Sequence, residues 1–364
     1  MSNQTIKRKE PYLRIAKRAE ISRGKIVSLR ITALVLALIA GGLFVGTLGY
    51  NPFSVYGTIL SGAFRSAMAV QATVKLMIPL LIASLGITLA FKMKFWNIGA
   101  EGQIIMGGVF ATYFALFCSH WNPILLIIVM FLAGAIGGGL WGLIPAIFKI
   151  KYDTNETLFT LMLNYIALHI VSYLRDGPWT DPHSQGFPTI ARFAPSTMLP
   201  KVFGVQIGWI IGLILVVLIG IYLKNTKQGY EISVVGESQD TARYAGMNVR
   251  KIILRTMFLS GAVCGLAGMI KATGSDCTLT IAIAGGVGFT AIIVAWLAQL
   301  NPVMILVISF LFSVLEKGSS VVQSTFGLSA NSASVLQGII LFFVLGCEFF
   351  VRFSIVRSNK KKEV

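Results

Sequence analysis

The sequence is poor in charge. Asp, Glu, Lys and Arg make up only 12% of its 364 residues, whereas 55% are apolar and the mean hydropathy is +0.77. A soluble domain of this size does not need so much apolar surface. The shortage of charge therefore excludes an ordinary soluble protein and predicts an integral membrane protein.

Catalytic motifs are also missing. The histidines His120, His169 and His183 are scattered, and neither H-E-x-x-H nor G-x-S-x-G occurs. The phosphate-binding pattern G-x-x-x-x-G-K-[ST] is absent as well, so any ATP chemistry must come from another chain. We therefore predict that the chain is not an enzyme and binds no cofactor.

Cysteine is scarce. The four residues Cys118, Cys264, Cys277 and Cys347 lie in or beside apolar runs and lack the spacing of metal ligands. This excludes a disulfide framework and a zinc site and predicts buried thiols. A disulfide between Cys118 and Cys277 stays open.

Acidic residues number only 14 against 31 Lys and Arg, which gives a formal charge of +17. Such a balance can indicate a nucleic-acid partner. Here, however, the basic residues gather in residues 7–30 and 352–362, beside apolar segments. We interpret them as anchors at the cytoplasmic membrane surface and predict no nucleic-acid partner.

Long apolar runs are abundant. A hydrocarbon core about 30 Å thick needs about 20 apolar residues at a rise of about 1.5 Å each. The first run exceeds the usual length of a signal peptide and predicts a retained signal anchor. On this basis we expect transmembrane helices near residues 29–49, 70–91, 98–118, 123–147, 157–174, 207–223, 254–273, 278–299, 302–322 and 332–352.

The distribution of Lys and Arg predicts the orientation. With a cytoplasmic N-terminus, ten spans place 24 of these residues inside and six outside, as the positive-inside rule requires. The predicted fold is an all-α polytopic membrane protein with both termini cytoplasmic. Eight spans with two re-entrant segments would keep the same ends. The expected parts are a basic segment 1–28, a transmembrane domain 29–352 and a basic tail 353–364.

Two connecting loops are unusually long. The outer loop 175–206 is rich in proline, which predicts an irregular but structured segment. It either only joins two helices or docks an external partner. In the inner loop 224–253 we expect an extended stretch over 229–235 and then a short helix over 239–245. Ser238 is placed to cap that helix and Gly246 to end it, so the loop offers either an interfacial helix or a docking helix.

Polar residues inside the apolar runs are candidates for the transport pathway. Asn164 and Tyr165 lie in the fifth predicted span, where Asn164 either hydrogen-bonds a neighbouring helix or faces a pore. Glu156 begins that span. Glu101 begins the third span, where it either complements the helix dipole or faces the inner mouth of the pathway. Asn97 is expected to cap the third span, and the glycines of residues 134–142 to pack helices closely.

Several ordered motifs resemble one family. Residues 95–103 read F-W-N-I-G-A-E-G-Q, and residues 236–249 run from Gly-Glu-Ser to Ala-Gly-Met-Asn-Val. Both are similar to motifs of bacterial ABC importer permeases for branched-chain amino acids, ribose-type sugars and nucleosides. Residues 155–167 and 177–179 resemble the nucleoside permeases that work with a basic-membrane lipoprotein. The chain departs from the family pattern at Trp296 and Gln299, where small and aliphatic residues are usual.

The resemblance implies one half of a transport pore in the bacterial plasma membrane. Its expected partners are a cytoplasmic ABC ATPase that binds ATP and Mg²⁺, a second and different permease subunit, an extracellular substrate-binding lipoprotein, and membrane lipid. It places the coupling to the ATPase on Glu237, Ser238, Arg243, Gly246 and Asn248.

Other transport classes stay open at this point. Ribose-type sugars are the alternative substrates. An ion-coupled secondary transporter is the alternative machine, although it would be expected to carry a mid-membrane carboxylate or histidine and broken helices in two halves. A passive channel or structural subunit would not need the inner loop.

Overall fold

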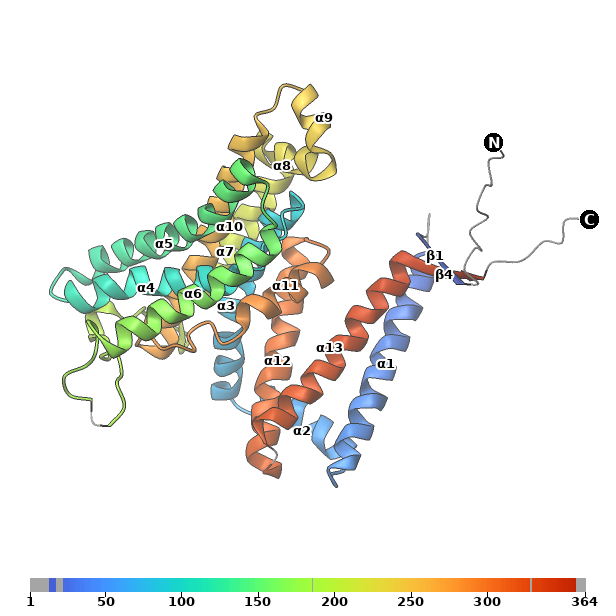
Figure 1. Ribbon diagram of the computed structural model, residues 1–364. Coiled ribbons are helices and arrows are strands. Elements are labelled where there is room, and N and C mark those ends of the chain that lie inside the picture. The colour runs from blue at the N-terminus through green and yellow to red at the C-terminus, as the bar shows by residue number, and fades with distance from the viewer. Residues whose placement is uncertain (1–12, 18–21, 185, 328, 358–364) are drawn as a thin grey trace, which may run out of the picture. The chain divides into compact units, whose positions relative to one another are not determined.

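Long apolar helices dominate the computed structural model, which describes residues 13–17, 22–184, 186–327 and 329–357. Apart from two small two-stranded sheets, the regular structure of these residues is helical. The chain divides into two units, Leu60–Gly318 and the combination of Met1–Ile59 with Ser319–Val364. The predicted all-α class is thereby confirmed (Figure 1).

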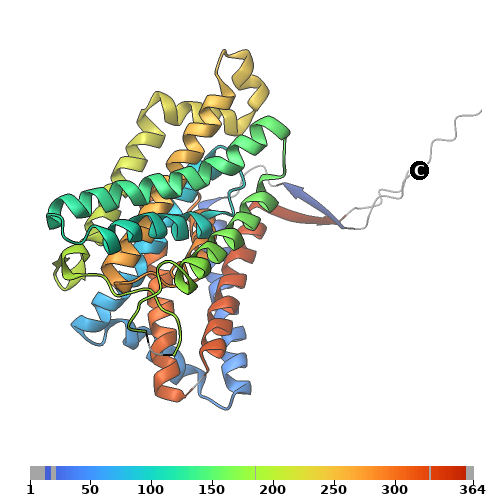
Figure 2. The same cartoon turned by 60° about the vertical axis from the view of Figure 1, so that its left-hand side comes forward.

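The larger unit contains most of the helices. They are α3 (Ala67–Lys92), α4 (Ala100–Phe117), α5 (Pro123–Tyr152), α6 (Glu156–Asp176), α7 (Gly208–Asn225), α8 (Lys227–Glu237), α9 (Gln239–Tyr244), α10 (Val249–Lys271), α11 (Val287–Leu297) and most of α12 (Pro302–Phe326). A π-helical turn, η2 (Ala272–Asp276), extends α10. Helices α4, α5 and α10 pack against one another in this unit, and Figure 2 shows α4 and α5 side by side.

Close packing of α4, α5 and α10 depends on glycine. A methyl group on Gly107 of α4 would overlap the backbone of Gly265 in α10, and one on Gly138 of α5 would overlap the backbone of Gly261. Small residues let helix backbones touch, so dispersion contacts replace the hydrophobic effect that lipid does not supply. The predicted packing role of the glycines in residues 134–142 is confirmed.

The smaller unit is built around α1 (Arg23–Thr47) and α13 (Ala330–Arg352), which pack against each other. After α1 the chain turns sharply into α2 (Pro52–Phe64), with Gly49 at φ +82° and Asn51 accepting a hydrogen bond from the backbone of Phe53. The sequence analysis missed this turn. Strands β1 (Leu13–Lys17) and β4 (Phe353–Arg357) pair antiparallel and bring the described parts of the two basic ends together.

Seven described helices are long and apolar enough to cross a bilayer: α3, α4, α5, α6, α7, α10 with η2, and α12. The segments Ile31–Thr47 and Pro52–Phe64 satisfy the same criterion as one broken span bent by 113°. The chain is therefore a multi-pass membrane protein. The number of spans and the orientation of the ends stay predictions.

The prediction of a continuous helix over residues 278–299 is wrong. Residues 277–286 are irregular, and only the 11 residues of α11 are helical. Gly285 and Gly286 adopt the left-handed conformation, at φ +57° and +83°, and this ends any helix that enters the segment. A helix of this length is about 16 Å long and covers only half of the hydrocarbon core.

The proline-rich outer loop is structured, as predicted. It contains a 3-10 turn η1 (Pro195–Thr197), the hairpin β2 (Lys201–Val202) and β3 (Val205–Gln206), and a bridge between Thr180 and Ile190. Its backbone also binds the irregular segment after α10, because the Phe193 amide donates to the Cys277 carbonyl at 2.9 Å. Cys118 and Cys277 are free thiols, so the possible disulfide is excluded.

Candidate functional site

The inner loop begins with a helix where an extended stretch was expected over residues 229–235. Thr226 caps this helix, α8, because its Oγ1 accepts a hydrogen bond from the Gly229 amide at 3.1 Å. The β-branched residues of the stretch suggested a strand. In the helix, Ile232 and Val235 instead form one buried face three residues apart, so burial outweighs their β propensity.

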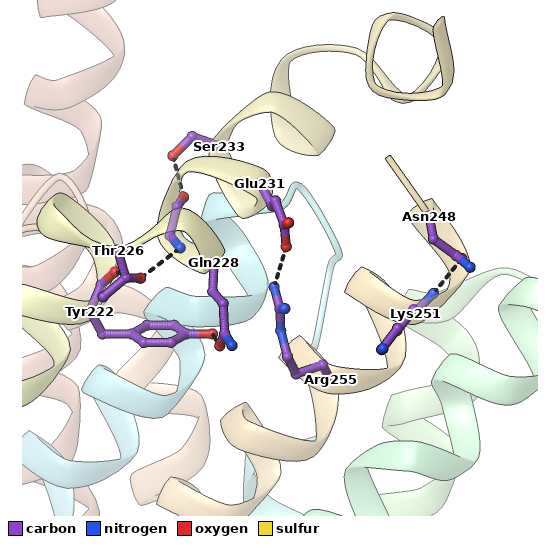
Figure 3. Close-up of polar contacts among 9 residues, drawn as sticks. Tyr222, Thr226, Gln228, Glu231, Ser233, Asn248, Lys251 and Arg255 are labelled. Carbon is purple, nitrogen blue, oxygen red and sulfur yellow. Dashed lines mark hydrogen bonds and ion pairs between the residues drawn. The ribbon is translucent and has the colours of Figure 1, made fainter. Parts of the chain in front are cut away.

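Two contacts fix α8 on the transmembrane helices. The Glu231 carboxylate accepts a hydrogen bond from the Arg255 guanidinium of α10 at 3.0 Å, and both side chains are mostly buried (Figure 3). At the other end of α8, a methyl group on Gly236 would overlap the carbonyl oxygen of Lys92, the last residue of α3. Helix α8 is therefore held against α3 and α10.

The short helix predicted over residues 239–245 is present as α9. Ser238 Oγ accepts a hydrogen bond from the Thr241 amide at 3.2 Å and caps the helix, as predicted. Gly246 follows the helix in the left-handed conformation at φ +76°, also as predicted. Arg243 is exposed and bonds Asp240 at 2.8 Å, and Tyr244 is 94% exposed.

The remaining predicted coupling residues lie at the ends of the neighbouring helices. Glu237 is the exposed last residue of α8. Asn248 caps α10, because its Oδ1 accepts from the Lys251 amide at 3.1 Å (Figure 3). The five residues named for coupling therefore all lie within or directly beside α9. We call Glu237–Asn248 the coupling segment.

Residues 95–103, here called the signature motif, form the bend from α3 into α4. Asn97 is not the helix cap that was predicted, because α4 begins at Ala100 with Gly99 as its capping residue. Asn97 is instead fully buried. Its amide exchanges two 3.3 Å hydrogen bonds with Gln103 and donates to Ser260 of α10 at 3.4 Å.

Helix α6 holds the signature motif with two polar side chains. Thr160 Oγ1 accepts a hydrogen bond from the Ile98 amide at 3.1 Å. Asn164 accepts from the Gly102 amide and donates to the Ile98 carbonyl, both at 2.9 Å. The predicted contact of Asn164 with a neighbouring helix is confirmed, and it uses both ends of the amide.

Glu101 lies in the first turn of α4, as predicted, but its carboxylate is directed at another element. It accepts hydrogen bonds from the backbone amides of Gly286 at 2.7 Å and Gly288 at 2.8 Å. Glu101 therefore caps α11, since the helix's own capping residue, Gly286, has no side chain for this purpose. Sequence reasoning missed this pairing because the two segments lie 185 residues apart.

The other pathway candidates have different surroundings. Tyr165 is 56% exposed on α6. Glu156 bonds Lys149 at 3.1 Å, and Lys149 also bonds Asp153 at 2.9 Å. This hydrogen bond lowers the pKa of Asp153, which lies between α5 and α6.

A cavity of about 530 Å³ lies between the outer loop and the irregular segment before α11. Phe187, Thr189 and Ile190 line one side of it, and Thr278 and Thr280 line the other. Thr278 also donates a hydrogen bond to the Ile190 carbonyl at 3.1 Å. The outer loop and the irregular segment before α11 therefore share one mainly apolar recess.

Comparison with known proteins places these features in context. Residues 73–345 match the sequence model of the family described as branched-chain amino acid transport system, permease component. The glucose ABC transporter permease protein TsgB13 of Haloferax volcanii is 31% identical, and the match covers 89% of this chain and 88% of that protein.

Two further relatives carry a nucleoside in their names. The guanosine ABC transporter permease protein NupP of Bacillus subtilis is 30% identical over 91% of this chain and 96% of its own length. The nucleoside ABC transporter permease protein NupB of Lactococcus lactis is 29% identical over 86% and 89%.

Proposed function

Because the chain belongs to the family of branched-chain amino acid transport system permease components, we propose that it forms half of the pore of an ATP-driven nucleoside importer. The observation that carries the proposal is the rigid coupling segment. It is a capped helix with an exposed polar face, fixed through α8 to α3 and α10. A separate ATPase would supply the energy and dock on this segment.

The geometry of the coupling segment supports this docking role. Ser238 and Gly246 define both ends of α9, so its conformation exists before a partner binds and little ordering entropy is lost on docking. Glu237, Arg243, Tyr244 and Asn248 leave an exposed mixed surface of charged, aromatic and amide groups. Aromatic and arginine side chains are those that most often anchor protein interfaces.

Nucleosides are the proposed substrates because the relatives NupP and NupB, which match most of this chain, carry that substrate class in their names. A sugar is the second candidate, favoured by the glucose permease TsgB13 at 31% identity. Nucleosides and sugars both carry hydroxyl groups, but only nucleosides carry a base, so a competition assay distinguishes the two classes.

We propose that the pathway passes the inner part of α6 and the first turn of α4. Tyr165 offers an exposed ring for transient stacking of a nucleobase. Glu156, Asn164 and Glu101 would shape the wall rather than bind substrate directly, since each already bonds a protein group. Weak contacts suit a permease, because alternating access requires release.

The other partners follow from the proposed orientation, with the termini and the coupling segment on the cytoplasmic side. A lipid-anchored binding protein would deliver substrate at the outer loop, whose recess is also lined by Thr278 and Thr280 of the segment before α11. A second, different permease subunit would complete the pore.

The test of substrate class is uptake into proteoliposomes that contain this chain with its partner subunits. Labelled guanosine is supplied with the binding protein and ATP, and competed with other nucleosides, ribose, glucose or leucine. The proposal predicts ATP-dependent uptake that only nucleosides suppress. Suppression by glucose or ribose alone would favour a sugar as the transported substrate.

A further inference from the structure

Helix α11 is bounded by left-handed residues at both ends. Gly285 and Gly286 precede it, and Gln299 and Leu300 follow it at φ +53° and +58°. Residues at the ends of an element are those that absorb the changes in φ and ψ when a helix reorients. At 11 residues α11 is a half-span, so it can turn as a unit between its two ends.

The N-terminal end of α11 is attached to the signature motif through Glu101. Its two carboxylate oxygens accept hydrogen bonds from the amide of Gly286, just before the helix, and from the amide of Gly288 in its first turn, at 2.7 and 2.8 Å. A methyl group on Gly288 would overlap the backbone of Glu101, so the two helix ends touch directly. A carboxylate at this place also complements the positive ends of both helix dipoles.

The C-terminal end of α11 is attached to the same motif through stacked aromatic rings. Trp296 lies on Trp96 with ring centroids 5.6 Å apart and an angle of 22° between the planes. Phe91 of α3 contacts both rings, at 5.6 and 5.8 Å. Within the signature motif, two residues five positions apart therefore hold opposite ends of one helix.

The coupling loop contacts the residues just before this motif. Gly236 at the end of α8 lies against the Lys92 carbonyl and Met93, three residues before Trp96. Ser238, the cap of α9, follows Gly236 by two residues. The end of α3 therefore links α8 and α9 on one side to the signature motif and α11 on the other.

We infer that Glu101 and Trp96 are positioning residues that join α11 to the coupling segment, so that α11 moves with this segment during transport. This inference rests on the proposed function and adds the element that the ATPase displaces. Rigid transmission requires both attachments, since a helix held at one end would pivot instead of translating.

The experiment compares uptake with ATP hydrolysis in the reconstituted transporter carrying Glu101→Gln or Trp296→Leu. The Gln side chain has only one acceptor oxygen for the two backbone amides of Gly286 and Gly288, so one of these hydrogen bonds is lost. We expect the ATPase to co-purify and to hydrolyse ATP within about twofold of wild type, while uptake falls about tenfold or more. Tyr173→Leu, at an exposed ring on α6, is the matched control.

A distance measurement reports the position of α11 itself. Spin labels at Phe289→Cys on α11 and Tyr113→Cys on α4, both exposed sites, are placed in a background without the four native cysteines. We expect one distance without ATP in the otherwise native protein and a broadened or shifted distribution in Glu101→Gln.

The outcomes separate this inference from the proposed function. Full uptake in both variants, or an unchanged distance in Glu101→Gln, overturns the inference, as does loss of ATPase binding. If Glu101→Gln fails to insert, Trp296→Leu decides, because it leaves the Glu101 cap in place. Failure of the proposed function is seen separately, as an absence of ATP-dependent uptake by the unmodified protein.

Discussion

Asn164 shows how much one side chain contributes at the bend between α3 and α4. It satisfies an amide and a carbonyl of the signature motif, and it is only 5% exposed. The bend has no regular hydrogen-bonding ladder of its own, so its backbone groups depend on such side chains. The motif is therefore held by its neighbours α6 and α10 as much as by its own sequence.

Replacing Asn164 with Leu should destabilise the folded protein by roughly 2–4 kcal/mol, because two buried backbone groups lose their partners. Thermal unfolding of the detergent-solubilised protein measures the effect. Tyr165→Leu, at the exposed neighbouring position, is the control and should unfold close to wild type. Equal unfolding temperatures for Asn164→Leu and wild type would contradict the assigned hydrogen bonds.

Tyr165 is the residue through which the pathway proposal is most easily tested. Loss of one stacking ring costs about 1–3 kcal/mol per base, so Tyr165→Ala should raise the KM for nucleoside uptake about tenfold. ATP hydrolysis should stay at the wild-type rate. Tyr173→Ala, two turns further along α6, should leave KM unchanged, and equal effects of both substitutions would argue against a pathway role.

Among the elements, α9 gains its order from caps rather than from length. Six residues are far too few for a stable isolated helix, so Ser238 at one end and Gly246 at the other decide its conformation. Docking of a partner on such a helix depends on those two residues even if neither touches the partner.

Ser238→Ala should weaken α9 by about 1 kcal/mol through loss of the cap. Hydrogen exchange at residues 239–245 should then accelerate several-fold, and the ATPase should bind more weakly. Ser233→Ala in α8 is the matched control, since this hydroxyl only donates to the Gly229 carbonyl within its own helix. Unchanged exchange in Ser238→Ala would show that the cap is unimportant.

The close contact between glycines of α5 and α10 leads to a second prediction. Gly265→Leu would place a large side chain at a position where even a methyl group would overlap the backbone of Gly134. We expect loss of folded protein after membrane extraction, measured by size-exclusion chromatography. Gly220→Leu in α7, with open space around it, should give a normal yield. Normal yield from Gly265→Leu would contradict the packing.

Sequence patterns predicted the elements whose physics is local. Apolar length found the helices from α3 to α7, and cap chemistry found both ends of α9. The failures occurred where distant contacts decide. The stretch predicted as extended over 229–235 is helical because its apolar face packs against neighbouring helices. The helix predicted over 278–299 is interrupted at Gly285 and Gly286, where the Gly286 amide bonds Glu101 of α4. A single sequence does not reveal such pairing.

On the scale of the whole molecule, the chain is a multi-pass membrane permease with a coupling loop attached to its packed centre. Family membership and the relatives at 29–31% identity establish that it is an ABC transporter permease. The signature motif contacts α6, α10 and α11, so this one bend joins three helices that are distant in the sequence.

ATP-driven nucleoside uptake by proteoliposomes carrying the double variant Arg243→Ala, Gly246→Val tests the central claim most directly. Valine at a left-handed position and loss of the exposed guanidinium should remove the docking surface while leaving the transmembrane helices intact. The account predicts normal membrane insertion, loss of ATPase binding and loss of uptake. ATP-dependent uptake at the wild-type rate would contradict it.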